Sequence, residues 1–170
     1  MPRLLPKLRI SPPTGPLLPG RGFYQLEESS LYVQIGPYSS NGRFFSYLES
    51  DHVRFDIDKD GRLLFIEIAA GRHTWKVDQT LQFPNSSSPA ELRWLDFRSS
   101  IPDPTIRTNP DRTLIHLGFP GAAPSQTLQI ADSVITEATS DNHLAGLFVN
   151  DIVDDLAGQE IARFRQQYRA

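Results

Sequence analysis

The sequence predicts an α+β domain that consists mainly of antiparallel β-sheet. Three observations support this fold class: one segment alternates strictly between apolar and polar residues, an apolar run follows an Asp-Gly pair, and the strand pattern occurs twice. We expect two three-strand meander repeats packed face to face about a pseudo-twofold axis, because a single meander cannot bury both faces of an apolar strand. A C-terminal helix and one short middle helix complete the expected fold.

The strands of the first repeat follow from side-chain periodicity. Residues 53–57 alternate between apolar and polar side chains, which is typical of an antiparallel strand with one buried face. Residues 63–68 are apolar on both faces apart from one glutamate, and Asp60-Gly61 lies between the two runs. Glycine supplies the positive φ that a tight turn needs, so the two runs predict a hairpin. Residues 31–35 provide the third strand.

The second repeat is recognised by its offset from the first. Residues 32–36 (Tyr-Val-Gln-Ile-Gly) recur at 114–118 as Leu-Ile-His-Leu-Gly. Asp60-Gly61 recurs as Asp141-Asn142, and asparagine tolerates the left-handed conformation better than most residues. The second copy therefore keeps the residue patterns of the strands and the turn, although most of the individual residues differ.

The chain divides into a proline-rich arm and one domain. Residues 1–22 hold six of the 14 prolines and no acidic residue, and they predict an extended arm that folding does not require. Residues 23–170 form the domain, with repeats at about 23–98 and 112–170 and an irregular connection at 99–111.

Two helices are expected. Ser88-Pro89-Ala90-Glu91 has the residue types of a helix start and favours a short helix over residues 89–98, with a strand as the alternative. Near the C-terminus, Asp154 or Asp155 is the expected cap of a second helix. Its apolar face would consist of Ala157, Ile161, Phe164 and Tyr168.

Composition excludes several classes of protein. The chain of 170 residues has no cysteine, so it contains no disulfide framework and no thiolate site. A net charge of -3 argues against a general nucleic-acid binder, and no apolar run is long enough for a transmembrane helix. The N-terminal residues lack the apolar core of a secretory signal, which favours a cytoplasmic location.

One segment matches the calcium loop of an EF-hand. In residues 56–67, the acidic residues Asp56, Asp58, Asp60 and Glu67 stand at ligand positions, and a glycine stands at the sixth position. The flanking periodicity is that of strands rather than helices. A hairpin turn is the alternative interpretation, because Asp and Gly dominate turns for backbone reasons. We expect the turn, and therefore no stabilisation by calcium.

Three residues are candidates for a ligand pocket between the repeats: His73, Trp75 and Trp94. His52 and His116 fall on polar positions of strands, where we expect exposed or edge histidines. The four histidines have no zinc-binding spacing, and neither a nucleophile motif nor a phosphate-binding glycine loop occurs. The sequence therefore predicts no catalytic residue and no cofactor.

The isolated repeat unit resembles a family of small bacterial domains of unknown function. The residues that carry the resemblance are Leu31-Tyr32-Val33 and the segment from Asp58 to Ile68, Asp-Lys-Asp-Gly-Arg-Leu-Leu-Phe-Ile-Glu-Ile. The chain departs from the pattern at Phe65, where the family has glycine. The second copy restores this glycine as Gly146 but has Phe148 in place of the glutamate. The resemblance implies tandem, diverged β-rich units with a trailing helix, and it implies no activity.

These observations favour a non-enzymatic binding or interaction module, acting as a monomer or a homodimer. Its partner would be an unidentified protein or small ligand, and neither nucleic acid nor a membrane is expected. The first alternative is a ligand-binding or enzymatic protein with its pocket between the repeats. The second is cation binding at the acidic turn, residues 56–67.

Overall fold

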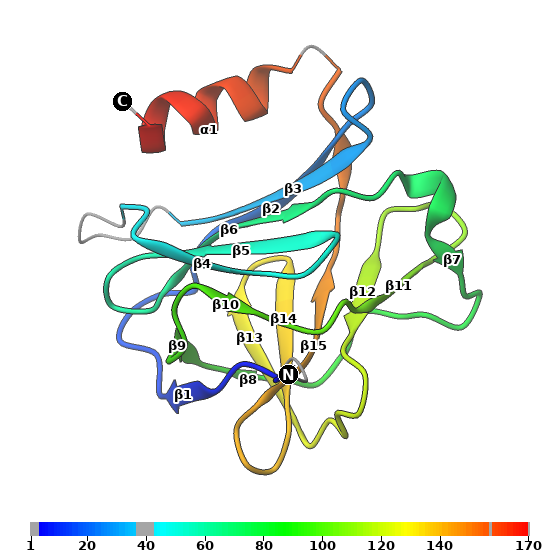
Figure 1. Ribbon diagram of the computed structural model, residues 1–170. Coiled ribbons are helices and arrows are strands. Elements are labelled where there is room, and N and C mark those ends of the chain that lie inside the picture. Colours follow the sequence, from blue (N-terminus) through cyan, green and yellow to red (C-terminus); the bar gives the residue numbers. More distant parts are fainter. Residues whose placement is uncertain (1–3, 37–42, 157, 170) are drawn as a thin grey trace.

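The computed structural model describes residues 4–36, 43–156 and 158–169, which form two seven-stranded sheets packed face to face, a two-stranded sheet of β1 and β9, and a C-terminal helix (Figure 1). The protein is therefore mainly β. The strands are β1 (Leu8–Ser11), β2 (Gly20–Gln25), β3 (Ser30–Ile35), β4 (Ser46–Glu49), β5 (Val53–Ile57), β6 (Leu63–Ile68), β7 (Lys76–Val77), β8 (Ser88–Pro89), β9 (Glu91–Trp94), β10 (Ser99–Ser100), β11 (Thr105–Thr108), β12 (Ile115–Gly118), β13 (Gln126–Ala131), β14 (Val134–Ala138), β15 (Leu144–Val149) and β16 (Val153–Asp154). The helical elements are the 3₁₀-helix η1 (Arg72–Thr74) and the α-helix α1 (Gln159–Arg169).

The strand order is β10-β4-β5-β6-β3-β2-β16 in the first sheet and β7-β11-β12-β15-β14-β13-β8 in the second. The five central strands of each sheet pair antiparallel, and each outermost strand pairs parallel to its neighbour. β7 follows β6 of the first sheet but pairs with β11 of the second. β16 follows β15 of the second sheet but pairs with β2 of the first.

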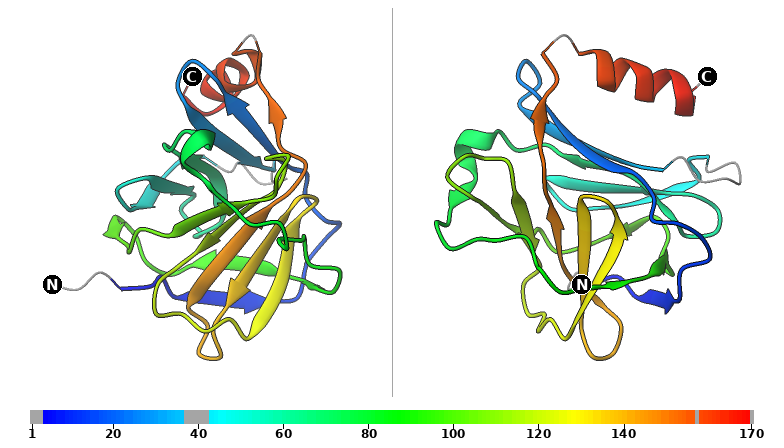
Figure 2. Two further views of the ribbon diagram at one scale, coloured as in Figure 1. Left: turned by 90° about the vertical axis from the view of Figure 1, so that its right-hand side faces the viewer. Right: turned by 180° about the vertical axis from the view of Figure 1, so that it is seen from behind.

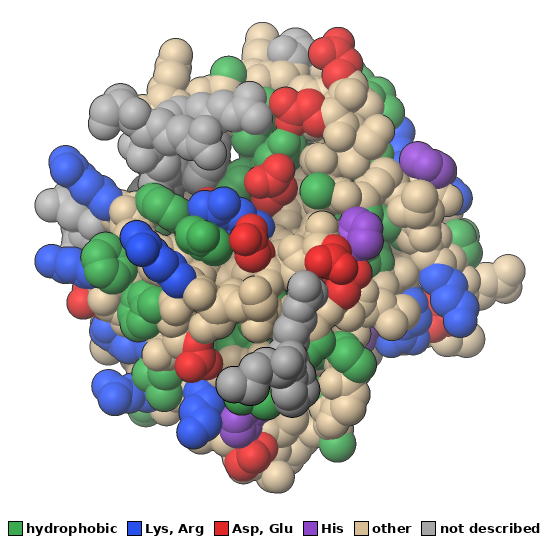
Figure 3. Space-filling model, in the orientation of Figure 1, with side chains coloured by type: hydrophobic (Ala, Val, Ile, Leu, Met, Phe, Trp, Pro, Cys, Tyr) green, Lys and Arg blue, Asp and Glu red, His purple; other side chains and the backbone are tan. Residues whose placement is uncertain are grey.

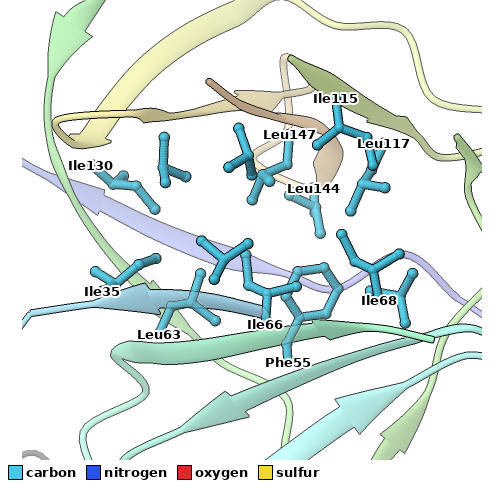
Figure 4. Packing of buried hydrophobic residues seen from close by; sticks show 14 of the residues in the cluster. Ile35, Phe55, Leu63, Ile66, Ile68, Ile115, Leu117, Ile130, Leu144 and Leu147 are labelled. Atoms are coloured by element: carbon cyan, nitrogen blue, oxygen red, sulfur yellow. The ribbon is translucent and has the colours of Figure 1, made fainter. Parts of the chain in front are cut away.

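The core lies between the two sheets, as the apolar pattern predicts. Val53, Phe55 and Ile57 of β5 are at most 1% exposed, and their side chains belong to a cluster that includes strands of both sheets. Figure 4 shows the two sets of side chains pointing toward each other, with Phe55 and Ile66 on one side and Leu144 and Leu147 on the other.

The predicted hairpin of β5 and β6 is confirmed. Gly61 has φ +81° and donates to the carbonyl of Asp58 at 3.0 Å. Asp58 is 3% exposed, and its Oδ1 accepts from the backbone N–H groups of Asp60 and Arg62, each at 2.9 Å. The acidic side chain at this position thus satisfies the turn's own backbone, which is the usual reason for Asp in turns.

The C-terminal helix is also confirmed, and Asp155 is its cap. The Asp155 carboxylate accepts from the backbone N–H groups of Glu160 at 3.2 Å and Ile161 at 3.3 Å, donors that have no partner within the helix. Ile161 packs on Phe23, Tyr32, Leu64 and Phe65, so α1 covers the outer face of the first sheet (Figure 2). Ala157 and the side chains of Phe164 and Tyr168 lie outside the described part of the chain.

The expected middle helix over residues 89–98 is wrong, because this region forms strands. Pro89 lies in the edge strand β8, and β9 pairs antiparallel with β1. Leu92 and Trp94 are buried while Glu91 and Arg93 are half-buried, which is the period of a strand. The N-terminal arm supplies the partner strand that the local sequence could not reveal.

The arm is packed in part, which corrects the expectation that all of it lies outside the core: residues 12–17 are exposed, but Pro6 and Leu8 are buried. Leu8 is 3% exposed and belongs to the central cluster. Proline lacks an N–H donor but keeps its carbonyl acceptor. Two prolines of the arm, Pro6 and Pro19, use this acceptor. The carbonyl of Pro6 accepts from Leu144 at 2.9 Å, and that of Pro19 accepts from Gly36 at 3.0 Å.

No helix among the described residues is long and apolar enough to cross a bilayer.

Candidate functional site

Large apolar side chains are exposed together at the edge of the first sheet, beside β4. Phe44, Phe45, Leu95 and Phe97 are between 41% and 57% exposed. The rings of Phe45 and Phe97 meet edge to face, with their centroids 5.9 Å apart. The backbone N–H of Arg98 donates to Oγ of Ser46 at 3.1 Å and holds this segment against β4. An exposed apolar group of this kind on a folded domain is typical of a contact surface.

Arginine side chains lie among these rings. The guanidinium of Arg54 is 4.2 Å from the ring centroid of Tyr47 and 5.7 Å from that of Phe44, and its Nε donates to Asp56 at 2.8 Å. Arg98 is exposed next to Phe97 and has φ +51°. Figure 3 shows hydrophobic and basic side chains side by side over β4 and β5, on the left of the view. The term aromatic–arginine surface refers below to Phe44, Phe45, Tyr47, Arg54, Leu95, Phe97 and Arg98.

A cleft borders this surface on the other side of segment 95–98. It has a volume of about 920 Å³ and is lined by parts of the arm, by residues 99–102 and by the β14–β15 turn. The backbone N–H of Lys7 donates to Asp96 at 2.9 Å, and His143 lies 3.2 Å from Asp141. Leu48 and Ile101, both fully buried, lie beneath it. Asp96 lines the cleft and lies in the sequence between Leu95 and Phe97 of the aromatic–arginine surface.

The three predicted pocket residues lie in different surroundings. His73 is exposed on η1 and lines a smaller cleft of about 450 Å³. Trp75 is 3% exposed, meets Tyr24 edge to face, and donates from Nε1 to the carbonyl of Ala70 at 3.0 Å. Trp94 is 1% exposed and packs on Phe55. Both tryptophans are therefore core residues, and neither lines either of these two clefts.

The four acidic residues of segment 56–67 are divided between the turn and the sheet. Asp58 faces the backbone of its own turn, and the carbonyl of Asp60 accepts from Arg93 at 3.3 Å. Asp56 lies on β5 and Glu67 on the neighbouring strand β6. In the register of these two strands, Glu67 stands opposite Arg54. No group of three or more metal-ligating side chains occurs among the described residues.

His52 lies near the surface in an ion pair with Asp103. Nδ1 of His52 is 2.7 Å from Oδ2 of Asp103, and Oγ of Ser50 donates to Oδ1 of the same carboxylate at 2.7 Å. The hydrogen bond to Asp103 raises the pKa of His52 above its ordinary value. Burial acts to raise the pKa of Asp103, but hydrogen bonds from Ser50 and His52 outweigh it and the pKa is lowered. The serine contacts the carboxylate rather than the imidazole, so this arrangement is no nucleophilic triad.

His116 is buried, which corrects the expectation of an exposed or edge histidine. It is 7% exposed, lies against Phe148 with ring centroids 4.4 Å apart, and has Nε2 2.6 Å from Oε1 of Glu137. Arg107 donates to Nδ1 at 3.1 Å and to Asp78 at 2.7 Å. A guanidinium only donates, so Nδ1 is the acceptor and Nε2 carries the hydrogen that Glu137 receives.

Gly146 provides the space for the connected polar side chains of Asp78, Arg107, His116 and Glu137. A Cβ on Gly146 would lie 2.4 Å from Oε1 of Glu137 and 3.0 Å from Nε2 of His116. Gly146 was visible in the sequence as a glycine inside a strand pattern, which is a recognised sign of close approach. The sequence did not show which residues of three neighbouring strands surround Gly146, because these contacts depend on the register of the sheet.

No protein-family model matches the sequence, and a search of curated proteins gives no match.

Proposed function

We propose that the protein is a non-enzymatic interaction module that binds another protein through the aromatic–arginine surface. The observation that carries this proposal is the exposure of Phe44, Phe45, Leu95 and Phe97 on one face together with two arginines. Aromatic residues and arginine are the residue types that protein interfaces favour, and a few of them supply most of the binding free energy.

The chemistry of the surface defines the partner. Arg98 is exposed, and the guanidinium of Arg54, which donates to Asp56, lies against two aromatic rings. A partner segment with acidic side chains beside an apolar one complements this arrangement. The apolar side chain would contact Phe45 and Phe97, and the neighbouring cleft provides space for a longer segment.

We also infer that the chain consists of two tandem copies of one unit related by a pseudo-twofold axis, as the resemblance to the small bacterial family implies. Two facts support this inference. The central strands follow the order β4-β5-β6-β3-β2 in the first sheet and the matching order β13-β14-β15-β12-β11 in the second. Each half also sends the segment after its last long strand to the other sheet, as β7 and β16. Such reciprocal contacts are the signature of twofold relationships.

Selection from a random-peptide display library tests the proposed function. The immobilised full chain should enrich acidic peptides that contain an apolar residue, and the double variant Phe45→Ser/Phe97→Ser should enrich none of them. Leu26→Ser is the matched control, because Leu26 is 50% exposed in the β2–β3 turn, outside this surface. Arg98→Glu should lose the acidic peptides while the fold is retained.

Two results would contradict the proposal: no enrichment by the native chain, or enrichment of the same peptides by the double variant. Light scattering of the native chain should give a monomer. A concentration-dependent dimer that Phe97→Ser dissociates would instead identify the surface as a homodimer interface.

A further inference from the structure

A second cleft, which shares no residue with the aromatic–arginine surface, lies where the chain crosses from β6 of the first sheet to β7 of the second. It has a volume of about 450 Å³ and is lined by Arg72 and His73 of η1 and by Asp111 and Arg112 of the β11–β12 turn. Figure 2 (left) faces this side of the molecule, where η1 lies near the turn. Three of its four lining residues are basic or can become so, and the volume is within the range of small-molecule sites.

Arg72 is held in a fixed orientation. Its guanidinium lies over the ring of Tyr24, 4.6 Å from the centroid, and Nη1 donates to Asp154 at 2.7 Å. Its backbone N–H donates to the hydroxyl of Tyr24 at 3.0 Å. Among the described residues, Asp154 is the only side chain that accepts from this guanidinium. Its remaining N–H groups can therefore donate to a ligand, and holding the plane in advance reduces the entropy lost on binding.

Arg112 lies in a turn that is stabilised by hydrogen bonds within the turn. Oδ1 of Asn109 accepts from the backbone N–H groups of Thr113 at 2.9 Å and Leu114 at 3.1 Å, and Nδ2 donates to Oγ1 of Thr113 at 2.9 Å. Arg112 has φ +58°, a conformation that residues with a Cβ rarely adopt. Strained residues that the surroundings hold in place occur preferentially at functional sites.

His73 completes the basic wall. Its imidazole lies directly over the backbone of Gly71: a Cβ there would be 2.5 Å from Cε1 and 2.8 Å from Nδ1. The absence of a side chain at position 71 thus allows the ring to lie in this place. Histidine donates from at least one ring nitrogen in either protonation state, so it can contribute a hydrogen bond to an anion.

We propose that Arg72, His73 and Arg112 form a binding site for a phosphate group, either free phosphate or the phosphate of a small organic ester. Two guanidinium groups from different elements line this one cleft, and Nη1 of Arg112 also donates to the carbonyl of Pro110 at 3.5 Å. A tetrahedral oxyanion accepts hydrogen bonds in every direction and therefore suits donors from two elements. Asp111 adds an acceptor to the wall, and it suits a hydroxyl of an organic phosphate. Asp154 already forms an ion pair with Arg72 and therefore neutralises part of the charge of that arginine.

Isothermal titration of the full chain tests the site with three probes: inorganic phosphate, glycerol 3-phosphate and glycerol. Glycerol should give no heat of binding. Arg112→Gln should weaken phosphate binding by roughly tenfold, the usual effect of losing one charge-assisted hydrogen bond. Arg9→Gln is the matched control, because Arg9 is also an exposed arginine and lies outside both this cleft and the aromatic–arginine surface. It should bind phosphate like the native chain.

The probes distinguish the two sources of the group. Tighter binding of glycerol 3-phosphate than of inorganic phosphate, with the difference reduced by Asp111→Asn, identifies an organic phosphate as ligand. Equal affinities identify free phosphate. Thermal melts of each variant establish that it is folded. The proposal is overturned if neither phosphate binds at millimolar concentration, or if Arg112→Gln and Arg9→Gln weaken binding equally.

Discussion

Replacing Gly61 by alanine should destabilise the protein because a backbone segment occupies the space of the new methyl group. Gly61 has φ +81°, and a Cβ at this position would lie 2.3 Å from the carbonyl oxygen of Trp94 and 3.2 Å from its nitrogen. The Trp94 N–H also donates to the carbonyl of Gly61 at 2.6 Å. Trp94 cannot retreat easily, since its side chain is 1% exposed and its strand β9 pairs with β1.

Two costs add in this variant. The left-handed conformation costs a residue with a Cβ about 1–2 kcal/mol. Displacing the packed backbone of Trp94 resembles overpacking a core and costs about 1–3 kcal/mol more. The total of about 2–5 kcal/mol corresponds to a fall in Tm of about 10 °C for a domain of this size.

Gly121→Ala separates the two costs. Gly121 has nearly the same conformation, φ +75°, but apart from its chain neighbours no atom lies within 4 Å of the place that a Cβ would take. This variant should lose only the conformational contribution, about 1–2 kcal/mol, or roughly 4 °C in Tm. Urea unfolding and thermal melts of both variants measure the difference. If both lose the same stability, Trp94 does not lie against Gly61 and the reasoning is refuted.

Three further predictions concern the ion pair, the arm and the crossing strands. Asp103→Asn should lower the pKa of His52 in an NMR titration, whereas Ser50→Ala should keep most of the rise; a pKa unchanged by Asp103→Asn would contradict the ion pair. The pKa of His52 is raised and the pKa of Asp103 is lowered, so the ion pair stabilises the protein at mildly acidic pH. This stabilisation is lost as the pH rises through the pKa of His52 or falls through the pKa of Asp103. Removing residues 1–11 deletes β1 and a buried leucine, so Tm should fall by roughly 10 °C; a fall of only a few degrees would instead support a dispensable arm. Residues 23–98 alone should be unfolded, aggregated or dimeric in light scattering, since β7 pairs with the other half, and a well-folded monomer would show that the halves are independent.

Local periodicity was sufficient to predict strands β3, β5 and β6 and the hairpin of the first sheet, but not β2, β4, β10 or β16. In residues 53–57 the alternating pattern identified the buried face, and Asp60-Gly61 marked the turn, because both signals depend only on neighbouring residues. For the same reason the sequence predicted Asp154 or Asp155 as the cap of the C-terminal helix, and the structure identifies Asp155. The N-terminal arm was misjudged because a count of prolines measures lost donors and ignores the acceptors that proline keeps.

The candidate sites depended on contacts that no local pattern encodes. Arg98 and Phe97 meet β4 only because β10 pairs with that strand, and the sequence gives no sign of this pairing. His116 has the alternation of a surface position, yet Arg107 and Glu137 from adjacent strands, together with Phe148, bury it. Such clusters require the register of several strands, which the sequence of any one strand does not contain.

The parallel strands at the outer edges of the two sheets restrict how another molecule can attach. Each edge ends in a strand of only two residues, β10 and β16 in the first sheet and β7 and β8 in the second. A two-residue strand offers too few backbone groups for a foreign chain to extend the sheet, and Pro89 in β8 removes one donor entirely. Sheet growth from copy to copy, the usual hazard of a β-rich protein, is thereby disfavoured at the four edges of the two seven-stranded sheets. A partner that binds at these edges must therefore recognise side chains rather than add a strand of its own.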